Sequence, residues 1–229
     1  AMVIASALLG GEPIVFRAWV DPFEESLTED APFFRLDGAQ VEVPLMQVTM
    51  DRARYARGED YQALELPYVG GDFVMLVILP DEGAYAAVDE RLDAAFFAEV
   101  RESVAAESDI QVFLPRFELT YSASLGDTLR AMGMELPFTD AADFGGMVQP
   151  DAGGSINISE VVHKAFVAVD ESGTEAAAAT AMVIASALLG GEPIVFRADR
   201  PFMFSIVDRV TGSVLFLGSM VDPTPGTDE

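Results

Sequence analysis

Residues 158–181 read ISEVVHKAFVAVDESGTEAAAATA, in which a strand-like half is followed by a half made of small residues. The apolar pattern of residues 156–169 predicts one long strand. Residues 171–191 show no core pattern, and by themselves they leave open a flexible linker or a helix built on the run of alanines. Because side chains alternate along a strand, an extended form of this segment would place only small side chains on one face, namely Thr174, Ala176, Ala178 and Thr180.

The flanking sequence predicts mostly strands. Apolar or alternating runs predict strands at residues 39–50, 61–66, 73–79, 109–121, 202–207 and 214–220. Helical spacing and stop signals predict helices at residues 88–105 and 125–134. Residues 73–79, FVMLVIL, are entirely apolar, so we expect this strand to be buried on both faces or to pair centrally in a sheet. No linker that would separate two independent domains is visible.

The composition is strongly acidic. The chain has 229 residues, 38 of them acidic and 13 basic, which gives a formal net charge of -25. Such a charge repels nucleic acid and anionic membrane surfaces. Lys164 is the only lysine, and this composition predicts salt adaptation, with the codon bias of a GC-rich genome as the alternative explanation. The chain has no cysteine, no apolar run near the roughly 20 residues that span a bilayer and no spacing typical of a metal site, so neither a metal nor a cofactor is predicted.

An exact internal repeat interrupts the chain. Residues 1–18 and residues 181–198 both read AMVIASALLGGEPIVFRA, and the identity stops abruptly at Trp19 against Asp199. Repeat architectures show approximate similarity at a regular period. One perfect copy with sharp edges instead indicates recombination or an assembly error, with a functional second copy as the alternative.

Several motifs in order resemble the serpin family. They are the opening stretch 158–181, WVDPF at 19–23, FVMLVILPDEG at 73–83, FLPRF at 113–117, DFGGM at 143–147 and FRADRPF at 196–202. The resemblance covers residues 19–223 and is specific because the motifs are independent. It implies an α+β fold of mixed β-sheets with few helices. It also implies a truncated serpin, in which residues 19–229 are the C-terminal part, residues 1–18 duplicate the reactive loop, and the N-terminal helices and part of the central sheet are missing.

The resemblance implies a serine protease inhibitor that acts as a suicide substrate, not an enzyme. The reactive loop would span about 171–195, its cleaved form would insert into a sheet as a new strand, and its hinge would comprise Glu171, Gly173, Thr174, Glu175, Ala176, Ala177, Ala178, Ala179 and Thr180. The reactive bond would join Ala187 and Leu188, with Ser186 or Leu188 as alternative cleavage positions. These small or apolar side chains favour an elastase-like or subtilisin-like protease.

Three further residues carry structural roles by resemblance. His163, the only histidine, would act as a hydrogen-bonding clasp where the sheet opens, a role that overlaps with that of an ordinary buried histidine. Arg116 and Glu171 would form an ion pair at the top of the sheet, with Trp19 beside them; the ordinary alternatives are a solvated arginine and a core tryptophan. One histidine and no nucleophile elbow give a hydrolase little support.

Two alternatives to the inhibitor stay open at this point. The chain could be a non-inhibitory serpin, acting as a carrier or chaperone, or an inactive fragment. We expect the intact protein to be a monomer that binds a serine protease, and a fragment to aggregate or associate through its loop and sheets. An extracellular location is expected for the parent protein, with its leader outside this sequence, and the cytoplasm is the alternative.

Overall fold

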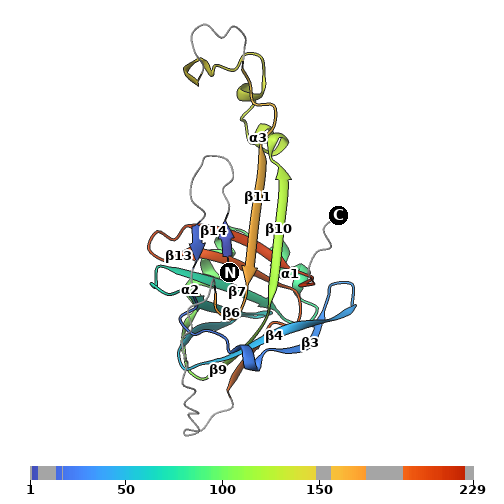
Figure 1. Cartoon of the computed structure of the whole chain (residues 1–229), viewed down its shortest axis with the longest axis vertical. Helices are drawn as coiled ribbons and strands as arrows, with labels where there is room; N and C mark the ends of the chain where they lie inside the picture. Colours follow the sequence, from blue (N-terminus) through green and yellow to red (C-terminus); the bar gives the residue numbers. More distant parts are fainter. Residues whose placement is uncertain (1, 5–13, 17, 148–155, 174–192, 225–229) are drawn as a thin grey trace. The chain divides into compact units, whose positions relative to one another are not determined.

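A computed structural model describes residues 2–4, 14–16, 18–147, 156–173 and 193–224, and it divides into two compact units. The larger unit includes Ile14–Glu118 and Val167–Glu229, and the smaller unit includes Leu119–Phe166. The sequence predicted no boundary here because the division falls inside two strands, which carry no linker composition. Those strands are β10 (Phe117–Ser124) and β11 (Val162–Val169), which pair side by side as a two-stranded sheet (Figure 1).

A six-stranded sheet forms the centre of the larger unit. Its order is β14-β13-β7-β6-β5-β8, with bounds Val214–Met220, Phe202–Asp208, Phe73–Pro80, Tyr61–Pro67, Ala53–Arg57 and Ala105–Glu107. Strand β7 pairs antiparallel with both β6 and β13, and all its residues after Phe73 are buried. The prediction of a central strand buried on both faces is therefore confirmed, and its apolar, β-branched sequence is the reason.

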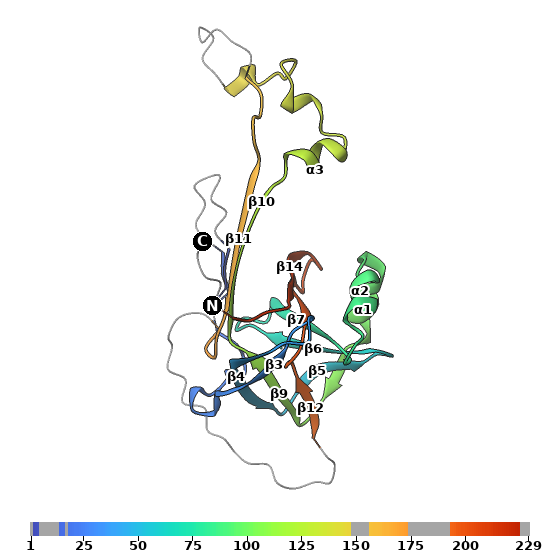
Figure 2. The ribbon, with the colours of Figure 1, turned by 90° about the vertical axis from the view of Figure 1, so that its right-hand side faces the viewer.

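Two helices, α1 (Tyr85–Glu90) and α2 (Ala94–Ser103), cover one face of this sheet (Figure 2). Val88 and Val100 from the helices pack with Leu76 and Ile78 of β7 in one buried cluster. The prediction of a single helix at 88–105 was wrong, because Asp93 interrupts it. The Asp93 carboxylate accepts hydrogen bonds from the backbone N–H groups of residues 95 and 96, at 2.9 and 2.8 Å, and so caps a second helix.

A four-stranded sheet completes the larger unit, in the order β12-β9-β4-β3. Its strands are Ile194–Arg197, Ile110–Pro115, Gln40–Met50 and Glu29–Phe34. Strand β12 is parallel to β9, and the other pairs are antiparallel. The predicted strand at 109–121 is in fact two strands, β9 and β10, which are separated at Arg116 after a proline that has no N–H to donate.

The smaller unit contains one helix, α3 (Gly126–Ala131), and two 3-10 turns, η2 (Leu136–Phe138) and η3 (Gly145–Met147). The predicted helix at 125–134 is present but shorter, and Gly133 follows it at φ +98°. The predicted strand at 156–169 begins only at Val162. A third 3-10 turn, η1 (Glu25–Leu27), precedes β3 in the larger unit, and the short strands β1 (Met2–Ile4) and β2 (Ile14–Phe16) pair with each other.

The observed architecture is the expected one of mixed sheets with few helices. Within the described residues, none of the helices is long and apolar enough to cross a membrane. The same residues contain no cluster of three or more histidine, cysteine or acidic side chains that could hold a metal ion.

Candidate functional site

The hinge predicted from the sequence begins where β11 ends, and the structure describes its first residues, Glu171 and Gly173. It brings Trp19 and Arg116 to the same place. The remaining hinge residues, Thr174 to Thr180, and the predicted reactive bond between Ala187 and Leu188 lie outside the described residues.

Glu171 is a buried carboxylate, with 4% of the residue exposed, and it accepts three hydrogen bonds from two side chains. Arg116 donates from Nε to Oε2 at 3.1 Å and from Nη2 to Oε1, so the ion pair is bidentate. The hydroxyl of Thr28, just before β3, donates to Oε1 at 2.6 Å. Burial of a carboxylate is costly unless it is paired and hydrogen-bonded. The charge of Glu171 therefore holds the hinge to two distant segments of the larger unit.

The protonation of this pair follows from the same contacts. Burial alone would raise the pKa of Glu171, but the hydrogen bonds from Arg116 and Thr28 outweigh it and lower that pKa below its ordinary value. The hydrogen bond to Glu171 in turn raises the pKa of the Arg116 guanidinium. Both groups are therefore charged at neutral pH, and their ion pair holds Glu171 in place.

Trp19 packs over the backbone of the hinge. Its indole Nε1 donates to the Asp170 carbonyl at 2.9 Å, and its ring stacks on Tyr68 with centroids 4.6 Å apart. The edge of Phe23 meets the indole ring at a centroid distance of 6.5 Å. The backbone N–H groups of Trp19 and Phe23 donate to the carbonyls of Ser172 and Glu171, at 3.2 and 3.0 Å. The residues 19–23 thus clamp residues 170–172 through both backbone and side chains.

Gly173 ends the described part of the hinge in a conformation that other residues rarely adopt. Its φ is +94°, and a Cβ at this position would lie 2.7 Å from both the Ala18 Cα and the Trp19 backbone nitrogen. The left-handed φ and the close approach of backbone both require glycine. The predicted reason for this glycine, a backbone turn into the loop, fits the geometry.

Two residues of this site were missed by sequence reasoning. Thr28 lies 143 positions before Glu171, and Tyr68 lies in a turn between strands; neither belongs to a motif that indicates contact with the hinge. Burial raises the pKa of the Tyr68 phenol, which is almost completely enclosed. No periodicity in the sequence could have located either side chain, because both contacts depend on tertiary packing.

His163 does not join this group. It lies on β11 in the smaller unit, where its side chain is exposed, so the interpretation as an ordinary buried histidine was wrong. The physical reason is that, within the described residues, β11 pairs only with β10, so nothing in that pair encloses the ring. Its role as a clasp remains a prediction.

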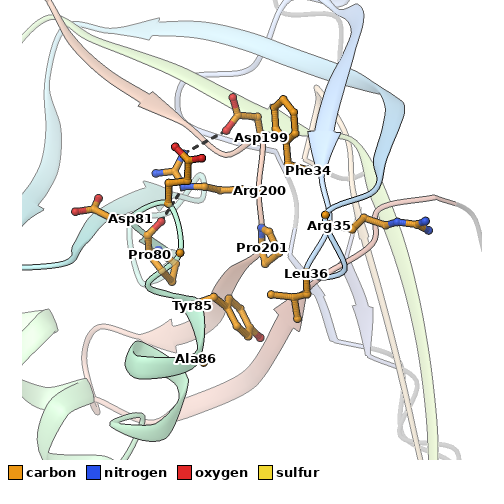
Figure 3. Close-up of a pocket in the computed structure, with 13 residues that line it drawn as sticks. Phe34, Arg35, Leu36, Pro80, Asp81, Tyr85, Ala86, Asp199, Arg200 and Pro201 are labelled. Carbon is orange, nitrogen blue, oxygen red and sulfur yellow. Dashed lines mark hydrogen bonds and ion pairs between the residues drawn. The ribbon is translucent and has the colours of Figure 1, made fainter.

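The described segment downstream of the predicted reactive loop is fixed at a second place. After β12, Arg200 donates from Nε to the Pro80 carbonyl at 2.8 Å and pairs with Asp199 at 3.2 Å. Figure 3 shows these residues at one wall of a pocket of about 710 Å³, which Phe34 and Tyr85 also line. The FRADRPF segment that follows the loop is therefore fixed to the end of β7.

The comparison with known families decides the identity. A model described as serpin (serine protease inhibitor) matches residues 12–223. The chain belongs to the serpin family. The match includes the end of the first repeat copy and the described segments on both sides of the predicted reactive loop. Serpins are, in general, inhibitors and not catalysts, and the family description names serine proteases as their targets.

Relatives agree with this assignment. A serpin-like protein of Thermococcus kodakarensis, itself uncharacterised, is 39% identical over 216 residues, which are 93% of this chain and 49% of that protein. Serpin-ZXA of Oryza sativa subsp. japonica is 37% identical over 225 residues, covering 94% of this chain and 56% of that protein. The chain thus spans about half the length of the curated relatives it matches.

Solved serpin structures share the fold. The complex of thyroxine-binding globulin with thyroxine superposes with a TM-score of 0.76 at 28% identity, over 93% of this chain and 55% of that one. The thermophilic serpin tengpin in its native state gives a TM-score of 0.75 at 28% identity, over 90% of this chain and 52% of that one.

Proposed function

We propose that this serpin inhibits serine proteases as a suicide substrate, and that the residues between the two anchors form its reactive loop. The observation that carries the proposal is that Glu171, at the start of the predicted hinge, is held by an ion pair and a hydrogen bond. The chain leaves β11 through Glu171, which Arg116 and Thr28 hold, and re-enters the fold at β12 beside β9. Between these points the sequence contains the small-residue run predicted to enter a sheet.

The chemistry would be an acyl transfer that does not finish. The protease serine attacks the carbonyl carbon of Ala187, and the peptide bond to Leu188 breaks. The nitrogen of Leu188 leaves with a proton from the protease histidine, and an ester joins Ala187 to the serine. Insertion of the freed hinge as a strand then carries the protease away before water can hydrolyse the ester. Ser186 and Leu188 are the alternative cleavage positions.

The ion pair of Arg116 and Glu171 would keep the hinge out of the sheet before cleavage. Insertion must begin at Glu171, because the residues that follow it are the first to enter. During insertion, the Glu171 carboxylate must either break its contacts with Arg116 and Thr28 or move together with them. These contacts therefore set a barrier to insertion. Cleavage removes the tension on the other end of the loop and lets strand pairing overcome that barrier.

Complex formation with an elastase-like or subtilisin-like protease tests the proposal, with the full-length protein as the reagent. An inhibitor gives a complex that survives denaturing electrophoresis. The variant Ala178→Glu puts a charge on the face predicted to enter the sheet and should turn the inhibitor into a substrate. The matched variant Ala177→Glu, on the opposite face, should keep the complex. Turnover without any complex for the wild type would exclude the mechanism.

A second candidate is a non-inhibitory serpin that acts as a carrier or chaperone. One observation favours it: a similar solved structure is a thyroxine-binding globulin, which holds thyroxine. Heat denaturation before and after cleavage of the loop separates the two candidates. Loop insertion raises the melting temperature of the cleaved protein, whereas a carrier that does not insert its loop shows no gain.

The surroundings of the protein are also proposed. We place it outside the cell, as a monomer, in a saline medium that screens its charge of -25. Cell fractionation tests the location against the cytoplasmic alternative. At this charge the protein should bind neither DNA nor vesicles of anionic lipid.

A further inference from the structure

A cluster of arginines lies in the larger unit, apart from the hinge. Arg54 on β5, Arg101 on α2 and Arg209 in the turn between β13 and β14 line one pocket of about 500 Å³ with Glu65 and Glu102. In a chain with 13 basic and 38 acidic residues, three guanidinium groups around one cavity are unusual. The proposed inhibitory function assigns nothing to them.

Two of these arginines share one carboxylate. Arg54 Nε lies 3.0 Å from Glu65 Oε2, and Arg209 Nη2 donates to the same oxygen. The Glu65 side chain is only 8% exposed, whereas that of Arg54 is 45% exposed and that of Arg209 is 35% exposed. Glu65 therefore forms the buried floor of the pocket, and the guanidinium groups extend from it toward solvent.

Among the residues that the structure describes, the third arginine forms no ion pair with a carboxylate. Arg101 donates from Nη1 to the Gly212 carbonyl at 3.2 Å, and Arg54 uses Nη2 for the Val104 carbonyl at 2.8 Å. Among the described residues, Nη2 of Arg101 and Nη1 of both Arg54 and Arg209 find no acceptor. These nitrogens are donors that the protein leaves available at the pocket.

The charge balance points the same way. Three guanidinium groups exceed the two carboxylates that line the pocket, so the cavity keeps a net positive charge inside an acidic molecule. A guanidinium presents its N–H groups in a planar fork that matches the oxygens of a phosphate or carboxylate. A spherical ion such as chloride can use only one direction of that fork at a time.

We propose that this arginine pocket binds a small oxyanion, with inorganic phosphate as the simplest example. The anion would take the free N–H groups of Arg101, Arg54 and Arg209, and it would tie α2 to the β13–β14 turn. Glu65 would hold two of the arginines in place and would repel an anion that approached the floor directly. Binding would therefore occur at the solvent side of the guanidinium groups.

Titration calorimetry and thermal unfolding of the chain with sodium phosphate test the proposal. The comparison solution is sodium chloride at matched ionic strength, because any salt screens a charge of -25. We expect saturable binding of one phosphate per chain and a larger rise in melting temperature with phosphate than with chloride. The variant Arg101→Gln should weaken phosphate binding at least about tenfold, since it removes one charge-assisted donor.

Arg101→Gln is preferred because substitution of Arg54 or Arg209 would leave the buried Glu65 short of a partner and could unfold the chain. The control is Arg130→Gln, which removes the same charge from an exposed pair with Asp127 in the smaller unit. It should bind phosphate like the wild type. Equal stabilisation by both salts, or equal phosphate affinity in Arg101→Gln and the wild type, would overturn the proposal and reduce the cluster to a structural ion-pair network.

Discussion

The contacts of the Glu171 carboxylate with Arg116 and Thr28 predict that residues 170–173 open locally when the charge of Glu171 is removed. Glu171→Gln keeps the size of the side chain but loses the negative charge that Arg116 neutralises and that the Thr28 hydroxyl hydrogen-bonds. A hydrogen bond to a charged group contributes roughly 1.5–3 kcal/mol. Because the Arg116 side chain is 47% exposed, we discount its share and expect a total loss of about 2 kcal/mol.

Hydrogen exchange measures this loss directly. The backbone N–H groups of Trp19 and Phe23 donate to the carbonyls of Ser172 and Glu171, so they exchange when the hinge opens. A loss of about 2 kcal/mol corresponds to about 30-fold faster exchange at these amides. Amides in β7, at the centre of the six-stranded sheet, should keep their protection. Unchanged exchange at the two clamp amides would refute the reasoning.

A matched control separates burial from charge pairing. Asp81→Asn breaks the bidentate pair of Arg57 and Asp81, whose two distances are 2.7 and 2.6 Å, but here the arginine is half exposed and the aspartate partly exposed. An exposed pair contributes at most about 1 kcal/mol. This variant should leave exchange at the hinge amides unchanged.

The stabilisation by the Glu171 carboxylate has a defined pH dependence. The pKa of Glu171 is lowered in the folded chain, so its stabilisation is complete above the unfolded pKa of about 4.3 and is lost as the pH falls through the folded pKa. The difference in hinge exchange between the wild type and Glu171→Gln should therefore be full above about pH 5 and should disappear in stronger acid. A difference that persists below the folded pKa would show that the charge is not responsible.

Four more substitutions, one of them a control, extend these predictions. Gly173→Ala should lower the free energy of unfolding, measured with urea, by about 3 kcal/mol, because strain at a positive φ adds to a clash with backbone. Gly71→Ala, the control, has φ +78° and open space around it, so it should lower that free energy by only about 1 kcal/mol. Trp19→Phe should cost about 1–2 kcal/mol through the hydrogen bond to Asp170; an unchanged urea midpoint would contradict this. Burial raises the pKa of Tyr68, so stability should fall as the pH rises above about 10, and Tyr68→Phe should reduce that fall in alkaline thermal scans.

Much of the fold was predictable because its strands carry strong local signals. The apolar run of β7 predicted its central position, and the hairpin of β13 and β14 was visible from two apolar runs around a turn. Element ends were less predictable. The single capping carboxylate of Asp93 divided a predicted helix. Strand β11 was shorter than its apolar pattern because none of the described strands pairs with residues 156–161.

The structure around Glu171 and Gly173 was partly predictable for a related reason. Glu171 and Gly173 belong to a contiguous motif, so the sequence alone indicated a hinge and the need for a flexible backbone there. The partners of that hinge come from segments far along the chain. The contact of Glu171 with Thr28 and the stack of Trp19 on Tyr68 depend on how the sheets pack, and no local pattern encodes them.

The repeated segment shows most clearly the difference between local strand propensity and the choice of strand partner. The sequence IVF forms a strand in both copies, as β2 and as part of β12, because its β-branched and aromatic residues favour extended backbone. The partners differ: β2 pairs with β1, whereas β12 runs parallel to β9. The Ala18 carbonyl accepts from the Val69 N–H at 2.9 Å, while the Ala198 N–H donates to the Phe113 carbonyl at 2.9 Å.

Local sequence thus determined the family and the tendency of the IVF segment in each copy to form a strand. Tertiary structure decided which strand each copy pairs with and which side chains contact residues 170–173. The physical reason is that backbone hydrogen bonds are the same for every residue except proline, so strand pairing is selected by the course of the chain and the packing of distant side chains.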